Sequence, residues 1–308
     1  AYQIPLRPYN VTGLENVRSF LKDNNIKYSR ETLAVQDIPK LNNVIDDLYN
    51  SGKRVVFTMG KGGVGKTTIA AAIALGLAKK GKKVHLTTTD PAAHLKFVID
   101  ESYGITISHI DEKEELEKYK ETVLSKARET MGSDDLAYIE EDLRSPCTQE
   151  IAVFRAFAEI VERSENEVVV IDTAPTGHTL LLLDSTQSYH KEIERSQGDI
   201  PESVSKLLPK LRNELDTEVI IVTLAEATPV YEALRLRNDL DRAGIHSKWW
   251  VINSSFYAAN TTNDILKVKA SNEVQWINKV NEISKGNFAI IEWTPEELKG
   301  DKLDTLIK

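Results

Sequence analysis

The sequence is poor in cysteine and in long apolar runs. A single cysteine, Cys147, among 308 residues excludes an intramolecular disulfide framework. No stretch of about 18 consecutive apolar residues is present, so no transmembrane helix is predicted. Both absences lead us to expect a reducing, cytoplasmic location.

The chain also lacks a basic tract. It contains 39 Lys and Arg against 47 Asp and Glu, which gives a net charge of −8. Because nucleic-acid binders neutralise phosphates with clustered Lys and Arg, this balance argues against a nucleic-acid partner. The hydrophobic fraction of 41% is typical of a globular protein. The length allows one large α/β domain or two smaller ones.

What the sequence does contain is a glycine-rich loop between a predicted strand and a predicted helix. It reads Gly60-Lys61-Gly62-Gly63-Val64-Gly65-Lys66-Thr67, followed by Thr68. The glycines let successive N–H groups face one anion, and the helix N-terminus adds its positive dipole. In such a P-loop, Lys66 reaches the β- and γ-phosphates and the Thr67 hydroxyl holds Mg²⁺. We therefore predict a site for a nucleoside triphosphate and Mg²⁺.

Apolar runs alternate with helical patterns along the chain. Strands are expected at 54–59, 83–88, 167–172, 218–223, 248–253 and 287–292, and helices at 66–80, 149–163, 228–243 and 264–284. This alternation predicts an α/β fold whose mainly parallel sheet has helices on both faces. The charged segment 111–144 reads as a helical insertion, and we expect a helical subdomain at about 105–165.

Two aspartates follow predicted strands, at positions where ligands of parallel sheets bind. Asp90 comes after the second strand and Asp172 ends the third. We expect Asp90 to orient the attacking water, and Asp172 to anchor Mg²⁺ through water. A role for Asp90 as the cap of the next turn is the alternative interpretation.

One short pattern, Ile-x₃-Pro-x₄-Gly, occurs near both ends of the chain. Its positions are Ile4, Pro8 and Gly13, and Ile291, Pro295 and Gly300. We interpret residues 1–22 as the tail of a preceding homologous repeat, 23–50 as a linker and 51–308 as the P-loop domain. Coincidence is the alternative explanation for three matched positions.

Three motifs together carry a resemblance to a known family. They are the second loop lysine, Lys61; the string Asp-Thr-Ala-Pro-Thr-Gly-His-Thr at 172–179; and Ser-Pro-Cys-Thr-x-Glu-Ile-Ala-Val-Phe at 145–154. The chain resembles the arsenite-pump ATPases, in the deviant Walker A (SIMIBI) class of P-loop NTPases, and is most similar to their second nucleotide-binding half. The resemblance implies that Lys61 reaches across a pseudo-dimer interface to the partner's phosphates.

The resemblance also implies a metalloid site. Its ligands for trivalent arsenic or antimony would be Cys147, Ser145 and His178. Soft thiolate suits such soft ions, and a helix starting near Cys147 would favour the thiolate form. A lone cysteine is more often a small buried hydrophobe, and His178 could equally be a hydrogen-bonding turn residue. The family's soft site draws further cysteines from the other half.

For the nucleobase, the resemblance implicates Asn253 and the segment near Pro295. A side-chain amide offers both a donor and an acceptor, which matches the edge of adenine. The expected activity is Mg²⁺-dependent ATP hydrolysis coupled to arsenite or antimonite. The implied partners are an N-terminal homologous half or second protomer, a membrane arsenite efflux protein that would recruit the chain peripherally, and an arsenic metallochaperone.

Three other functions are alternatives for a P-loop protein of this kind. A targeting ATPase for tail-anchored proteins would need a Met-rich groove and a paired-cysteine zinc site, and this chain has two methionines and no Cys-x-x-Cys. A nitrogenase iron protein would need two cysteines per subunit for its cluster. A nucleotide-binding regulatory half without turnover of its own stays open.

Overall fold

A parallel sheet of seven strands forms the centre of the computed structural model, which describes residues 6–9, 11, 13–22, 38–90, 95–99, 103–130, 132–173 and 202–308. The strand order is β3-β2-β4-β1-β5-β6-β7, and every pairing is parallel. The bounds are β1 (Val55–Met59), β2 (Val84–Thr88), β3 (Ile105–His109), β4 (Val168–Asp172), β5 (Thr217–Leu224), β6 (Trp250–Ser255) and β7 (Phe288–Glu292). The predicted α/β fold with a parallel sheet is confirmed.

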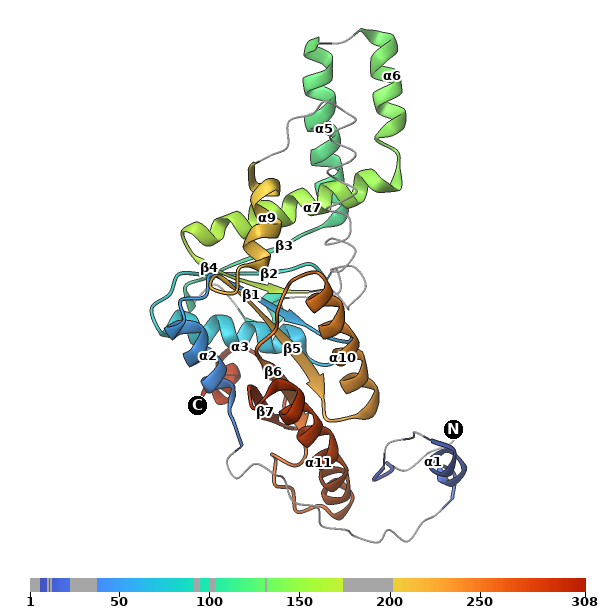
Figure 1. Cartoon of the computed structure of the whole chain (residues 1–308), viewed down its shortest axis with the longest axis vertical. Coiled ribbons are helices and arrows are strands. Elements are labelled where there is room, and N and C mark those ends of the chain that lie inside the picture. Colours follow the sequence, from blue (N-terminus) through green and yellow to red (C-terminus); the bar gives the residue numbers. More distant parts are fainter. Residues whose placement is uncertain are drawn as a thin grey trace.

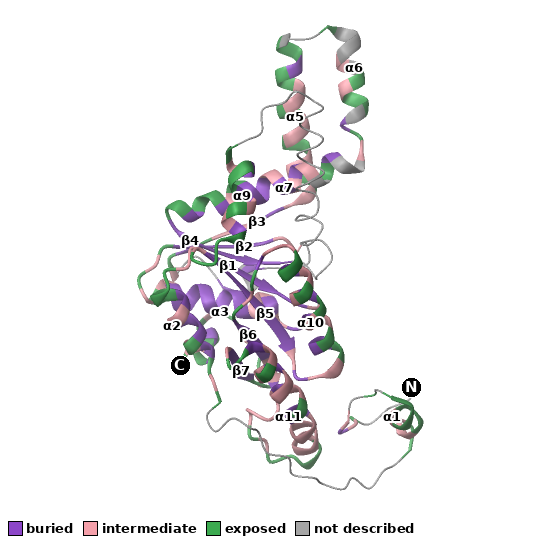
Figure 2. Ribbon diagram, in the orientation of Figure 1, coloured by how far each residue is buried: buried purple, intermediate pink, exposed green. Residues whose placement is uncertain are grey.

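Helices cover both faces of this sheet (Figure 1). Side chains alternate along each strand, so Val56 faces one helical layer and Val55 the other. The first layer contains α2 (Leu41–Asn50), α3 (Lys66–Lys79) and the 3₁₀ helix η3 (Gly300–Ile307). The second contains α7 (Pro146–Glu162), α9 (Glu202–Arg212), α10 (Ala227–Arg242) and α11 (Asp264–Ser284). Central strands buried on both faces explain their continuous apolar runs (Figure 2).

The helical insertion projects away from the sheet. It consists of α5 (Glu112–Thr130) and α6 (Ser133–Asp142), with α7 lying across its base (Figure 1). Three short elements complete the described chain: α1 (Gly13–Ser19), α4 (Leu95–Val98) and the 3₁₀ helix η2 (Arg163–Glu165). None of the described helices has the length and apolar character needed to span a bilayer.

Two elements differ from the sequence expectations. Strand β3 was not predicted, because it lies at the sheet edge and only Ile105 of its five residues is buried. The last ten residues of the range expected as a linker form α2, whose apolar face packs into the core. That face consists of Leu41, Val44, Ile45 and Leu48.

Candidate functional site

The P-loop runs from β1 to α3 and lies tightly against the neighbouring strands. Gly60 has φ +155°, and a Cβ there would lie 2.2 Å from the carbonyl oxygen of Val222 in β5. Gly65, directly before α3, has φ +91°, and a Cβ there would lie 2.2 Å from Nδ2 of Asn253 in β6. Both positions therefore require glycine, which is the physical reason for the loop's composition.

Lys66 occupies the first turn of α3 and is nearly buried, with 6% of its surface exposed. Its Nζ donates to the Lys61 carbonyl at 3.3 Å. Burial lowers the pKa of Lys66, while the charges of Asp172 and Asp90 raise it in return. A cation held at the start of a helix, where backbone N–H groups also point, is suited to binding a polyanion.

Asp172 ends β4 at the centre of a hydroxyl cluster. Its Oδ2 accepts from Thr67 Oγ1 at 2.7 Å and from Thr88 Oγ1 at 3.2 Å, and its Oδ1 accepts from Thr58 Oγ1 at 3.4 Å. Burial raises the pKa of Asp172, although these hydrogen bonds and the Lys66 charge oppose the rise. The cluster thus joins the first turn of α3 to the ends of three strands.

The donor set of this cluster fits Mg²⁺. A hydroxyl and a carboxylate are the hard oxygen ligands that Mg²⁺ prefers. Because Thr67 donates its proton to Asp172, its oxygen lone pairs are available to a cation. Thr67 would hold the ion directly and Asp172 through water.

Asp90 lies near Lys66 and Asp172. It is half-buried, and its backbone N–H donates to Thr88 Oγ1 at 3.1 Å. The preceding N–H, of Thr89, donates to the Asp172 carbonyl at 2.9 Å, which ties this stretch to β4. The Asp90 charge raises the pKa of both Lys66 and Asp172. The structure therefore brings together Lys66, Thr67, Asp90 and Asp172.

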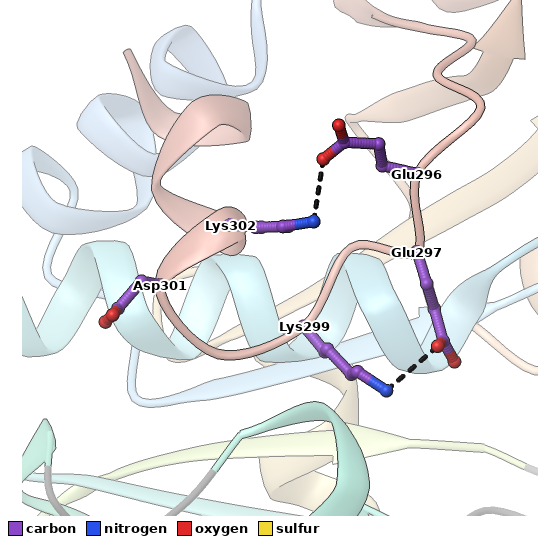
Figure 3. A pocket seen from close by; sticks show the side chains of 5 residues that line it. All are labelled: Glu296, Glu297, Lys299, Asp301 and Lys302. Atoms are coloured by element: carbon purple, nitrogen blue, oxygen red, sulfur yellow. Dashed lines mark hydrogen bonds and ion pairs between the residues drawn. The ribbon is translucent and has the colours of Figure 1, made fainter.

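Of the two residues expected at the nucleobase, Asn253 lies in β6 and Pro295 lies after the neighbouring strand β7. Asn253 Nδ2 donates to the Val64 carbonyl of the P-loop at 3.0 Å. Pro295 is exposed in the segment after β7. Beyond it lies a surface cavity of about 640 Å³, crossed by ion pairs from Lys302 to Glu296 at 2.7 Å and from Lys299 to Glu297 at 2.9 Å (Figure 3).

Comparison with known proteins agrees with this geometry. The family model for anion-transporting ATPases matches residues 53–211 and 185–306. The chain belongs to the anion-transporting ATPase family. An arsenical pump-driving ATPase of Escherichia coli is 41% identical over 306 residues, covering 98% of this chain and 52% of the relative. One from Acidiphilium multivorum is 40% identical over 313 residues, with the same coverage.

A more distant relative of the chain is ATPase GET3 of Malassezia globosa, 25% identical over 319 residues, which cover 89% of this chain and 96% of the relative. The chain spans about half the length of the Escherichia coli and Acidiphilium relatives.

Only some of the predicted metalloid ligands are among the described residues. Ser145 is half-buried directly before α7, and Cys147 is the second residue of that helix. His178 and the loop around it lie outside the described residues. Among the side chains that are described, no group of three or more His, Cys, Asp and Glu could hold a metal ion. The metalloid site stays a prediction.

Sequence reasoning missed two hydroxyls of the cluster, Thr58 and Thr88. Thr58 is the last residue but one of β1, and Thr88 is the last residue of β2. Both strands are buried and end at the P-loop edge of the sheet. A buried threonine at the carboxyl end of a strand was the available signal. Its meaning depends on which strands are neighbours.

Proposed function

We propose that the chain is an Mg²⁺-dependent ATP hydrolase domain, the second nucleotide-binding half of an arsenite- and antimonite-stimulated pump ATPase. The observation that carries the nucleotide part is the hydrogen bond from Thr67 to the buried Asp172, next to the buried Lys66, at the mouth of the P-loop. The metalloid part is supported by the 41% identity to a relative named as an arsenical pump-driving ATPase.

Each residue of the site has a role in this proposal. The P-loop N–H groups and Lys66 bind the triphosphate, while Asp172 orients the Thr67 hydroxyl. Asp90 orients water for in-line attack on the γ-phosphate. When bound, Mg²⁺ neutralises charge on the phosphates. Lys61 of a partner domain adds a second cation, so that hydrolysis depends on assembly.

The preceding repeat is supported by a comparison of α1 with η3. Gly13 (φ +78°) and Gly300 (φ +55°) both open a short helix with apolar residues. In η3 these residues pack against α3, whereas in α1 they are exposed. The exposed fractions are 0% for Leu303 and 8% for Leu306, against 73% for Leu14 and 56% for Val17. We propose that α1 belongs to a domain preceding this one. Near it, Asn272 of α11 donates to the Pro8 carbonyl at 3.0 Å.

The metalloid would bind where α7 begins. Cys147 supplies a soft sulfur ligand, and Ser145 and His178 complete the set offered by this chain. The other half would supply further cysteines, so that metalloid binding draws the two halves together. Delivery to a membrane efflux protein, loading by an arsenic metallochaperone and a cytoplasmic, peripherally membrane-associated location belong to the same proposal.

Steady-state ATP hydrolysis with and without arsenite tests the proposal. The samples are the chain alone, its Cys147→Ser variant, and each of these with the N-terminal half. We expect arsenite to stimulate the wild-type pair and to lose most of that effect with Cys147→Ser. Arsenate, which is not a soft thiolate-binding ion, is the matched control and should not stimulate. Absence of arsenite stimulation in every combination would contradict the metalloid role.

A regulatory half without turnover of its own is the second candidate, because the chain spans about half the length of its relatives. Single-turnover hydrolysis with the chain in excess over ATP separates the two. A burst of phosphate supports a hydrolytic domain, and its absence with ATP bound supports the regulatory half.

A further inference from the structure

The end of β6, beside the site, has an irregular backbone. The pairing of β6 with β7 shifts register between Ile252 and Ser255. Within that shift, Ser254 adopts φ +53°, a left-handed conformation that residues other than glycine rarely take. Such irregularities re-aim side chains and persist only where the surroundings enforce them. Here the irregular residue, Ser254, directly follows Asn253.

The residue that enforces the loop at 254–257 is Glu273 of α11. Its carboxylate accepts three hydrogen bonds: Oε2 from Ser255 Oγ at 2.6 Å and Tyr257 N–H at 3.0 Å, and Oε1 from Phe256 N–H at 3.0 Å. Glu273 is only 7% exposed. A buried carboxylate is costly unless its oxygens are satisfied, so these donors are held in one arrangement.

The same loop is joined to both neighbours of the expected base position. On one side, Asn253 Nδ2 donates to the Val64 carbonyl of the P-loop at 3.0 Å. On the other, the Trp293 N–H donates to the Ser255 carbonyl at 2.9 Å, and the rings of Trp293 and Phe256 lie 5.2 Å apart. The loop thus connects the P-loop to the segment that leads into Pro295.

We infer that Glu273 is a positioning residue for nucleobase recognition, fixing the loop 254–257 so that Asn253 and the Pro295 segment are presented to one purine base. This inference rests on the proposed function, since it presumes a nucleotide on the P-loop. It assigns the role to a residue of α11, which packs beside β6 and β7 (Figure 1).

Glu273→Gln is the informative substitution because it keeps the shape of the side chain. The glutamine amide has one oxygen, and its NH₂ group cannot accept. If the NH₂ group takes the place of Oε1, two donors face each other at the Phe256 N–H. If it takes the place of Oε2, two donors face each other at the Tyr257 N–H. Either way one backbone donor loses its acceptor and the loop must move.

The control is Glu218→Gln in β5. Glu218 is 3% exposed and accepts from the N–H groups of Lys248 at 2.9 Å and Trp249 at 3.4 Å. It is therefore a buried glutamate that fixes backbone at the opposite end of β6. Its replacement by glutamine removes a buried carboxylate charge, which pairs with Lys53 at 3.7 Å, without a contact to the loop at 254–257.

Calorimetric titration of the full chain with ATP, GTP and inorganic tripolyphosphate, each with Mg²⁺, tests the inference. We expect Glu273→Gln to weaken ATP binding about tenfold and to reduce the ATP-to-GTP preference, with tripolyphosphate affinity unchanged. Glu218→Gln should leave all three affinities unchanged. An unaltered ATP affinity in Glu273→Gln, or an equal loss for ATP and tripolyphosphate, would overturn it.

A substitute variant and the binding by the wild-type chain decide the remaining cases. Should Glu273→Gln fail to fold, Ser255→Ala removes the hydroxyl donor to Oε2 and must show the same selective loss, or the inference is wrong. Wild-type chain that binds tripolyphosphate but does not prefer ATP over GTP overturns the inference alone. Wild-type chain that binds neither ATP nor tripolyphosphate overturns the proposed function as well.

Discussion

The carboxyl group of Asp172 is buried at the end of β4, where the proposed Mg²⁺ site needs its charge. Burial raises its pKa above the ordinary value of 3.8. The folded state therefore favours the protonated form, so the charge lowers stability once the pH exceeds the raised pKa, and this cost is absent below 3.8. At neutral pH the buried charge of Asp172 therefore lowers the free energy of unfolding.

Asp172→Asn should consequently raise the melting temperature of the nucleotide-free chain by a few degrees and abolish the extra stabilisation that Mg²⁺ adds to ATP. Thermal melts with ATP, with and without Mg²⁺, measure both effects. Glu218→Gln, which also removes a buried carboxylate with a raised pKa, is the control and should keep the Mg²⁺ response. An Asn variant that still responds to Mg²⁺ would show that Asp172 does not anchor the ion.

His85 in β2 gives the fold an acid-sensitive element. It is 1% exposed, and its Nε2 lies 2.8 Å from Ser108 Oγ. Burial, and then the Arg163 charge, lower its pKa from 6.5 to about 4, while Glu167 opposes the shift. In the unfolded chain His85 binds a proton as the pH falls through 6.5, whereas in the folded chain it binds one only near pH 4. The stability that comes from the neutral, buried His85 is therefore complete above pH 6.5 and is lost as the pH falls from 6.5 to about 4.

Replacing His85 with Gln should therefore flatten the loss of stability between pH 7.5 and pH 4.5 by up to about 3 kcal/mol. Urea unfolding at several pH values, compared between wild type and variant, measures the difference. Parallel curves for the two proteins would mean that other groups cause the acid sensitivity.

At the scale of elements, local pattern predicted the central strands, because a buried parallel strand is apolar on both faces. The same reasoning could not reveal the cluster around Asp172. Its partners Thr58 and Thr88 come together only because β4 lies between β1 and β2, an order that local sequence does not encode. The P-loop was predictable in detail, because phosphate binding between a strand and a helix requires glycines at the same spacing wherever it occurs.

Helix α2 shows the converse limit. Its apolar spacing is visible in the sequence, but whether that face is buried depends on packing against α3, which the local pattern of 23–50 does not encode. Ile45 is 0% exposed, and a Cβ on Gly76 of α3 would lie 2.6 Å from its Cδ1. The two helices are thus in direct contact at a glycine.

Ile45→Ala should accordingly lower the free energy of unfolding by about 2–4 kcal/mol, through lost burial and a residual cavity. Asn50→Ala, at the exposed end of the same helix, should change it by less than about 0.5 kcal/mol. Urea unfolding of both variants measures the contrast. Equal, small effects would mean that the packing of α2 against the core contributes little to stability and that α2 behaves as part of a linker.

At the scale of the whole molecule, Lys61 decides whether one domain suffices for turnover. Its carbonyl holds Lys66 in place, while in the described part of the chain its ammonium has no hydrogen-bond or ion-pair partner. If the ammonium serves a partner's phosphates, as the family resemblance implies, each complete site takes Lys66 from one domain and Lys61 from the other.

Complementation between two inactive variants tests this arrangement. Lys61→Gln and Lys66→Gln should each hydrolyse ATP at a small fraction of the wild-type rate when assayed alone at high protein concentration. Mixed in equal amounts, they should recover about a quarter of that rate, because half of the pairs are mixed and each mixed pair has one complete site. If Lys61 acted within its own domain, no mixture would contain a complete site. An inactive mixture, under conditions where wild-type activity rises with the square of concentration, would therefore place Lys61 in its own site.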